Sequence, residues 1–343
     1  MAKRKLVFIT QVVDPDDPNL GATTAKLAAL ARRVDELVVL CDRGREGVLP
    51  DNCRLRVFGA PSRVQRAGRF VRALSDEMRD RPGAVVAHMI PLYALVAAPI
   101  VRPRRVRLIL WYTHWKRHLL LRAATAVSTD VVSVDEHSFP LQSRKLHAIG
   151  HGIDLSEFPC QPTTFSGALR LVALGRYSPA KNLEELIEGV RLARGRGVDA
   201  RIDLYGTTGA PQNEEYKRRL EALEYDFVGV GGPVPRTEVP AVYAQADVVA
   251  SDFDSPDKVV LEGCASCRPV LASDDSFHAL LEGIEPPLAF VRGRPEMLAD
   301  RIAALAALGD EERHAIGRTL RERVAAAHSV DTWADAIVKL AAA

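Results

Sequence analysis

Alternation of short apolar runs with helical patterns constrains the fold of this chain more than any other feature. Residues 5–13, KLVFITQVV, form a β-type run, and the helical pattern ATTAKLAALARRV follows at 22–34. The same order recurs along the chain, for example in the run LRLVALGRY at 169–177 and the helical stretch at 182–197. Strands that alternate with helices favour parallel βαβ sheets. The sequence therefore predicts an α/β fold.

The length of the chain predicts more than one domain. At roughly 150 residues per domain, 343 residues make two. The stretch at 151–168 is rich in Gly, Pro, Ser and Thr, which is typical of a linker. We therefore expect Rossmann-like domains at 1–150 and 169–325, and a final helix at 326–343 that packs back on the first. Two doubly wound domains would face each other across a cleft, with ligands outside the carboxyl ends of the strands.

Charge is distributed unevenly between these domains. Residues 1–150 contain 25 Lys and Arg against 14 Asp and Glu, whereas the rest contains 21 against 30. Halves of opposite sign predict a cleft between them and a basic first domain that meets an anionic partner. Nucleic acid is not expected, because base stacking needs aromatic residues among the basic ones, and Phe70 alone lies beside the arginines of 63–72.

Cysteine content and one apolar segment bear on location. Five scattered cysteines, an odd number, predict no disulfide framework and a reducing cytoplasm. The uncharged run at 83–101 approaches membrane-spanning length but contains His88, Pro91 and Pro99. We expect a buried strand at 84–89 and a core helix that begins at Pro91, where proline is tolerated. The predicted location is the cytoplasm, with peripheral contact at the inner face of a membrane as a further option.

Polar residues follow predicted strands in the second half. In ALGRYSPAKN, Arg176 comes directly after a strand and Lys181 lies at a helix start, which suits a diphosphate, although two solvated loop charges would look the same. In DSPDKVVLEGCASCRPVLAS, at 254–273, Glu262 follows an apolar run, and a buried acid needs a partner. If a helix begins at Lys258, its free N–H groups face the same anion. Asp254 and Glu262 can then both accept hydroxyls of a sugar or ribose.

Three segments together resemble a known family. RKLHAIGHGIDLSEF resembles its domain junction, LVALGRYSPAKNLEELIEGV its first carboxyl-domain strand, loop and helix, and VPAVYAQADVVASDFDSPDKVVLEGCASCRPVLAS its paired-acid segment. The family is that of the retaining glycosyltransferases of glycosyltransferase family 4, which have the fold called GT-B. The resemblance covers most of the chain and is strongest at 145–273. It implies two Rossmann-like domains and a nucleotide-sugar donor.

The resemblance implies roles for individual residues. Arg176 and Lys181 would hold the donor diphosphate and stabilise the leaving group without a metal or other cofactor. Glu262 would accept ribose hydroxyls, and Asp254 hydroxyls of the sugar. The remaining donor-binding positions are Gly175, Lys258, Val259, the base-lining Val234, and Gly21, which resembles a glycine loop at the donor phosphate.

His114 resembles an acceptor-side histidine near the anomeric carbon, although a lone histidine could equally be a core residue. With it, the implied catalytic set is His114, Arg176, Lys181 and Asp254. The implied function is a retaining hexosyltransferase that uses a donor most often linked to UDP or GDP and acts on a glycan or lipid-linked acceptor. A sugar-nucleotide epimerase of the same fold, or a catalytically silent nucleotide-sugar or membrane-surface binding protein, are the alternatives.

The chain departs from the family pattern in its acid segment. Asp254 is one methylene shorter than the usual Glu, Asp257 replaces a glycine, and Lys258 replaces an apolar residue. Asp252 and Asp254 also match a short Asp-x-Asp pattern by which a different glycosyltransferase fold binds a metal, but we expect no metal. Cys264 and Cys267 have redox spacing inside a predicted helix, for which core packing is the preferred interpretation.

Four arginines recur every three residues in a predicted amphipathic helix. One interpretation is a solvated helix face, and the other is a helix drawn to anionic lipid headgroups or to the acceptor. The residues are Arg63, Arg66, Arg69 and Arg72.

Overall fold

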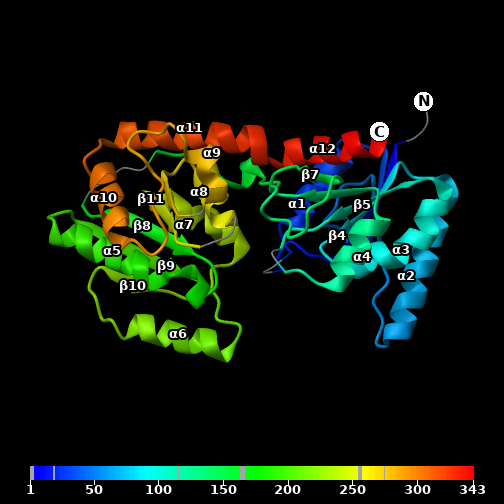
Figure 1. Ribbon diagram of the computed structural model, residues 1–343, viewed down its shortest axis with the longest axis horizontal. Coiled ribbons are helices and arrows are strands. Elements are labelled where there is room, and N and C mark those ends of the chain that lie inside the picture. The colour runs from blue at the N-terminus through cyan, green and yellow to red at the C-terminus, as the bar shows by residue number, and fades with distance from the viewer. Residues whose placement is uncertain (1–3, 18–19, 115, 163–166, 254–256, 274) are drawn as a thin grey trace. The chain divides into compact units, whose positions relative to one another are not determined.

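The structure, a computed structural model, consists of two compact units (Figure 1). It describes residues 4–17, 20–114, 116–162, 167–253, 257–273 and 275–343. The first unit comprises residues 1–154 and 327–343, and the second comprises residues 155–326. The sequence had placed these boundaries at 150 and 325. Both units are α/β, and their parallel sheets confirm the predicted Rossmann-like class.

A parallel sheet forms the centre of the first unit. Its described strands follow the order β3-β2-β1-β4-β5-β6-β7, and Leu6 of β1 lies opposite Leu37 of β2 and Ala84 of β4. The strands are β1 (Lys5–Val13), β2 (Glu36–Gly44), β3 (Cys53–Val57), β4 (Ala84–His88), β5 (Arg107–Trp111), β6 (Asp130–Ser133) and β7 (Leu146–Ala148).

Helices cover both faces of this sheet, which explains its nearly continuous apolar strands. Val7 and Ile9 of β1 pack in one cluster with side chains of α2 (Arg63–Glu77), α3 (Pro91–Val101) and α4 (Leu119–Val127). Leu6 and Phe8 point the other way, toward α1 (Thr23–Ala31) and α12 (Val330–Ala342). The alternation follows from the two-residue period of a strand. The chain's last helix, red in Figure 1, thus packs in the same unit as its first.

The apolar segment at 83–101 forms a strand and a helix. β4 is fully buried, and α3 begins at Pro91, as the sequence predicted. Within the part of the chain that the structure describes, no helix is both long and apolar enough to cross a membrane.

The second unit has a smaller parallel sheet of the same type. Its described strands follow the order β10-β9-β8-β11-β12. They are β8 (Leu169–Leu174), β9 (Ala200–Tyr205), β10 (Val228–Val230), β11 (Val248–Ser251) and β12 (Val270–Ala272). Its helices are α5 (Leu183–Gly195), α6 (Pro211–Glu221), α7 (Val239–Gln245), α8 (Lys258–Ala265), α9 (His278–Leu281), α10 (Pro295–Ala306) and α11 (Asp310–His328), which ends in the first unit.

The order of these strands places the switch point of the sheet between β8 and β11. The chain leaves β8 toward β9 on one side, and β11 lies on the other side. Loops after two such strands diverge and leave a crevice at their carboxyl ends, which is where ligands of open α/β sheets bind.

One prediction about the cysteines is wrong. Cys160 and Cys267, separated by 107 residues, form a disulfide, while Cys41, Cys53 and Cys264 are free. Cys267 lies in the turn after α8 at φ 56° and is fully buried, and the bond joins this turn to the segment that opens the second unit. The bond removes the sequence argument for a reducing compartment.

Candidate functional site

The loop after β8 is held tightly at the switch point. The buried Tyr177 hydroxyl shares its one proton between the carbonyl oxygens of Leu204 (2.9 Å) and Gly231 (2.8 Å), at the ends of β9 and β10. Gly206 passes so close that a Cβ there would lie 1.6 Å from the Gly175 carbonyl oxygen. Gly175 itself has a φ of 140°, in the region that favours glycine. The loop therefore presents Arg176 and Lys181 from a rigid support.

The two cations of this loop have different surroundings. The Arg176 side chain is exposed, and no hydrogen bond or ion pair links it to another described residue. Lys181 ends a short 3₁₀ helix (Pro179–Lys181), and its Nζ forms an ion pair with Asp257 and lies 4.4 Å from the centroid of the Phe253 ring. Thus Arg176 points to solvent, whereas Lys181 is already paired.

Asp257 is the N-cap of α8. Its carboxylate accepts from the backbone N–H of Val259 (3.4 Å) and from the Ser251 hydroxyl (3.1 Å). The residue preceding a helix satisfies one of the free N–H groups in this way. The predicted helix from Lys258 is confirmed, and one of its free N–H groups has an acceptor within the protein.

Glu262 lies one turn into α8 and is buried, with 4% of its surface exposed. Its Oε1 is 2.6 Å from Arg236 Nη1 and 2.8 Å from Lys258 Nζ, and Tyr243 donates to its Oε2 over 3.3 Å. Burial alone would raise the pKa of Glu262, but Lys258 and Arg236 hold it below the ordinary value. The buried acid therefore has protein partners. Its proposed contact with ribose hydroxyls stays a prediction.

Arg236 links this carboxylate to the start of the second unit. It also forms an ion pair with Glu157 of a 3₁₀ helix (Leu155–Glu157), and its guanidinium lies 5.1 Å from the centroid of the Phe158 ring. Arg236 follows the loop that holds Val234, which is half-buried. The three segments predicted to contact base, ribose and diphosphate thus belong to one connected region.

A second buried carboxylate lies at the end of β11. Asp252 Oδ2 accepts from the Asn182 side chain (2.9 Å) and the Gly293 backbone (3.3 Å), while its Oδ1 is buried and has no hydrogen bond to another described residue. Asp254 lies outside the described residues, so its predicted roles in sugar binding and in an Asp-x-Asp motif stay predictions. Among the described residues, no cluster of three or more His, Cys, Asp or Glu could hold a metal ion.

The remaining predicted residues lie in the first unit. Gly21 precedes α1, and a Cβ there would lie 2.4 Å from the Pro15 carbonyl oxygen. His114 follows β5 with an exposed side chain, whose Nδ1 accepts from the Lys116 backbone N–H (3.0 Å). His114 is therefore not a core residue, which excludes the simpler of its two interpretations.

The four arginines all lie on the exposed part of α2. Arg66 pairs with Asp42 (3.2 Å), and Arg69 donates to the Gly59 carbonyl oxygen (2.6 Å). Val64 and Val71, on the same helix, are 82% and 39% exposed. The helix thus presents both basic and apolar side chains to its surroundings, beside the other members of the set, Arg63 and Arg72.

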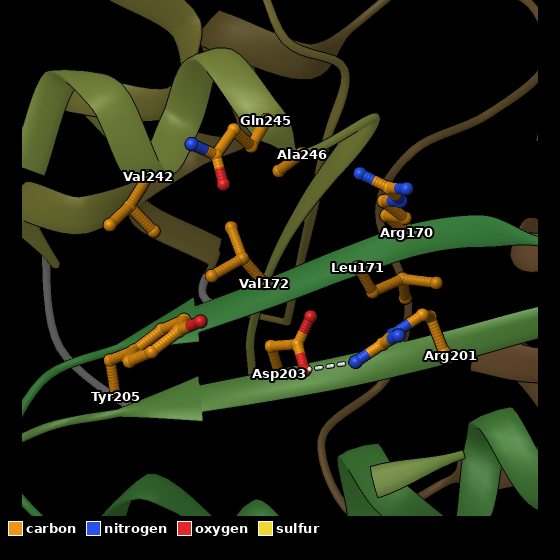
Figure 2. A pocket seen from close by; sticks show the side chains of 9 residues that line it. All are labelled: Arg170, Leu171, Val172, Arg201, Asp203, Tyr205, Val242, Gln245 and Ala246. Atoms are coloured by element: carbon orange, nitrogen blue, oxygen red, sulfur yellow. Dashed lines mark hydrogen bonds and ion pairs between the residues drawn. The ribbon is translucent and has the colours of Figure 1, made fainter. Parts of the chain in front are cut away.

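A separate cavity of about 220 Å³ lies between β8, β9 and α7 (Figure 2). Arg170 and Arg201 line it from the amino-terminal parts of their strands, and Arg201 is paired with Asp203 (2.8 Å). None of the predicted donor residues within the described part of the chain lines this cavity. The cavity runs along β9 from Arg201 to Tyr205, away from the loops that diverge between β8 and β11. Because ligands of such sheets bind where those loops diverge, the switch point is the stronger candidate.

Sequence reasoning missed several residues that the structure brings to the switch point. Arg236 and Tyr243 lie 26 and 19 positions from Glu262 in the sequence, and no local pattern predicts that they contact it. Asp257 was noted only as a departure from a family pattern. An aspartate directly before a helix is, however, a recognisable capping signal.

Comparisons with known proteins agree with this architecture. The sequence model of the family described as "Glycosyl transferases group 1" matches residues 168–307. No curated protein sequence matches the chain.

Solved structures match almost the whole chain at low identity. Anabaena Alr3699/HepE in complex with UDP and glucose is 17% identical over 98% of this chain and 99% of its own, with a TM-score of 0.73. A glycosyltransferase from Rickettsia africae is 12% identical over 99% and 98%, with a TM-score of 0.76. Sucrose-phosphate synthase from Thermosynechococcus elongatus is 17% identical over 98% of each chain, with a TM-score of 0.71. Residues 168–307 thus match the glycosyl transferases group 1 family, and the chain has the two-domain Rossmann-like GT-B fold of glycosyltransferases.

Proposed function

We propose that this chain is a retaining glycosyltransferase of family 4 that transfers a hexosyl group from a nucleotide-sugar donor to a glycan or lipid-linked acceptor. The observation that supports this most is the convergence at one switch point of Arg176, Lys181 and the start of α8, all within the matched residues. Cations beside a helix N-terminus suit a diphosphate. The HepE structures contain UDP, UDP-glucose, or UDP and glucose, so we propose UDP before GDP as the donor nucleotide.

In the proposed reaction, the bond between the anomeric carbon and the diphosphate oxygen breaks, and its electron pair stays on the diphosphate. Arg176 and Lys181 stabilise that charge without a metal, because fixed cations are most effective where charge develops. An acceptor hydroxyl oxygen forms the new bond to the anomeric carbon on the same face of the sugar, and its proton passes to the departing diphosphate oxygen. His114 acts on the acceptor side, Asp254 holds sugar hydroxyls, and Glu262 with Val234 holds ribose and base.

Nucleotide binding is the first test. The thermal stability of the wild type is measured with UDP, GDP, ADP and TDP, with and without EDTA. A nucleotide at 100 times its dissociation constant adds about 2.7 kcal/mol to stability. We expect one nucleotide to stabilise the wild type, and EDTA to change nothing. No shift with any nucleotide would contradict the proposal.

Arg176→Ala is the variant for the same test, because the side chain is exposed and its removal leaves the fold intact. It should weaken nucleotide binding at least tenfold. Arg191→Ala, which removes an exposed arginine of α5 paired with Glu188, is the matched control and should bind as the wild type does. Glu262→Ala is a less clean probe because Glu262 is buried among charged partners.

Turnover separates the competing functions. His114→Ala should lose sugar transfer while it keeps nucleotide affinity, since its proposed role is on the acceptor side. An epimerised sugar nucleotide formed without acceptor would instead support an epimerase. Nucleotide binding by the wild type without turnover of any donor would support a silent binding protein.

We also propose that α2 contacts anionic membrane, where a lipid-linked acceptor would be found. Arg63 and Arg72 supply charge there, and the exposed Val64 and Val71 supply apolar area. The wild type should sediment with phosphatidylglycerol vesicles and not with phosphatidylcholine vesicles. The double variant Arg63→Glu/Arg72→Glu should lose this binding, and Arg218→Glu, on α6 of the second unit, should keep it. Equal binding to both vesicle types would contradict the proposal.

A further inference from the structure

The ion pair between Lys181 and Asp257 joins the two loops that flank the switch point. Lys181 comes from the loop after β8, and Asp257 from the segment after β11. Their side chains are only 15% and 10% exposed. Because so little water surrounds them, the charges are weakly screened, and each strongly affects any third charge nearby.

Asp257 is held in place independently of Lys181. It caps α8 through the Val259 N–H and accepts from the Ser251 hydroxyl. Lys181 is likewise supported by the ring of Phe253 and by its place in a short 3₁₀ helix. The carboxylate is therefore a fixed negative charge beside the cation.

We propose that Asp257 is a specificity-determining residue that weakens binding of the nucleoside diphosphate product relative to the nucleotide-sugar donor. The inference rests on the proposed function, in which Lys181 holds the donor diphosphate. A phosphate at Lys181 Nζ lies within a few ångström of the Asp257 carboxylate, so the two negative charges repel each other.

The repulsion differs between donor and product because their charges differ. In a nucleotide sugar, the terminal phosphate is esterified and carries one negative charge. In the free nucleoside diphosphate that phosphate also loses a second proton, whose pKa is about 6 in phosphate monoesters. Near neutral pH the product is therefore about one unit more negative than the donor. Asp257 selects against that extra charge, and it favours release of the product after transfer.

Asp257→Asn tests this directly, because asparagine caps a helix as well as aspartate does but carries no charge. Calorimetric titration with UDP and UDP-glucose, or with the nucleotide found in the first test, should show at least tenfold tighter product binding. Donor binding should tighten less, by about threefold. In turnover, inhibition by the product should strengthen by a similar factor. Asp257→Ser, which also keeps a capping oxygen, is the second variant should the first one fold poorly.

Two controls separate charge from structure. Asp203→Asn removes a carboxylate paired with Arg201 in the same sheet but outside the switch point, and should leave both affinities unchanged. The second control repeats Asp257→Asn in the Lys181→Met variant. There it should change the ratio of product affinity to donor affinity less than it does in the wild type, because Lys181 holds the phosphate beside Asp257.

Each outcome has one meaning. Wild type that binds nucleotide, with unchanged or weaker product binding in Asp257→Asn, would overturn this inference and leave the proposed function standing. Equal tightening of donor and product binding in Asp257→Asn would also overturn this inference, because Asp257 would then not distinguish between the two ligands. Folded wild type and variants that bind no nucleotide would overturn both.

Discussion

Arg236 stands between two carboxylates, 2.6 Å from Glu262 Oε1 and paired on its other side with Glu157. Glu262 belongs to α8, and Glu157 to the first residues of the second unit. A single guanidinium thus connects the helix at the candidate site to the point where the chain enters that unit.

Arg236→Met should lower the free energy of unfolding of the second unit by about 3 kcal/mol, because removing one partner of a buried ion pair leaves the buried Glu262 carboxylate less well compensated. Lys258 still forms an ion pair with Glu262, so the loss of stability should not exceed this value. Urea unfolding measures it. Arg191→Met, which breaks an exposed pair on α5, should cost less than about 1 kcal/mol. Equal losses in the two variants would contradict the structural role of Arg236.

His88 makes the first unit sensitive to acid. It is fully buried, with its Nδ1 2.9 Å from Thr10 Oγ1, and burial together with the charge of Lys26 lowers its pKa to about 3. The unfolded chain, with a histidine pKa near 6.5, binds this proton more readily than the folded one. The part of the free energy of unfolding that depends on neutral His88 is therefore fully present above about pH 6.5. It falls toward pH 3, by up to about 1.4 kcal/mol per pH unit.

This pH dependence should be visible in urea unfolding of the wild type at pH 7, 6, 5 and 4. His88→Gln should be less stable at pH 7 and should have a slope that is one proton shallower over this range. His278→Gln, which replaces an exposed histidine, should retain the wild-type slope. An unchanged slope in His88→Gln would show that other groups cause the acid sensitivity.

The disulfide between Cys160 and Cys267 should stabilise the second unit. It closes a loop of 107 residues, and disulfides typically add about 2–4 kcal/mol by constraining the unfolded chain. Cys160→Ser, or the wild type under reductant, should lose that amount in thermal or urea unfolding. Cys53→Ser, which replaces a free cysteine of the first unit, should respond to reductant as the wild type does. Denatured, unreduced protein should contain three free thiols, and five would contradict the bond.

Gly21 should not tolerate a side chain. A Cβ there would lie 2.4 Å from the Pro15 carbonyl oxygen and 2.8 Å from that of Asp17, both backbone atoms. Gly21→Ala should therefore lower the free energy of unfolding, measured in urea, by about 1–3 kcal/mol, because the backbone has to move. Gly68→Ala on α2, where nothing lies within 4 Å of the added carbon, should instead stabilise the protein by up to about 1 kcal/mol. Similar changes in the free energy of unfolding for the two variants would show that the backbone near Gly21 can move without a large loss of stability.

Much of the fold could be predicted because its signals are local. Runs such as residues 5–13 became strands, Pro91 opened a helix as expected, and the helix from Lys258 has the predicted start. Each depends on the conformational preferences of neighbouring residues and on which face they bury. Arg176 and Lys181 follow β8, as the strand pattern predicted, and their roles in binding stay predictions.

Side-chain partners could not be predicted in the same way. The bond between Cys160 and Cys267 joins residues 107 positions apart, and the count of five cysteines pointed the other way. For Glu262, the sequence required a partner without naming one. Which cation approaches a buried acid depends on how distant segments pack, and that has no local signature.

The sequence by itself determined the α/β class, the two-domain division and the set of polar residues after the strands of the second half. These depend on hydrophobic periodicity and on the alternation of strands and helices along the chain, which are properties of neighbouring residues. Only the tertiary structure decided that Lys181 is paired with Asp257 and that Glu262 lies between Arg236 and Lys258. The physical reason is that charge pairing acts over a few ångström of space, and that proximity comes from the packing of β8, β11 and the loop after β10.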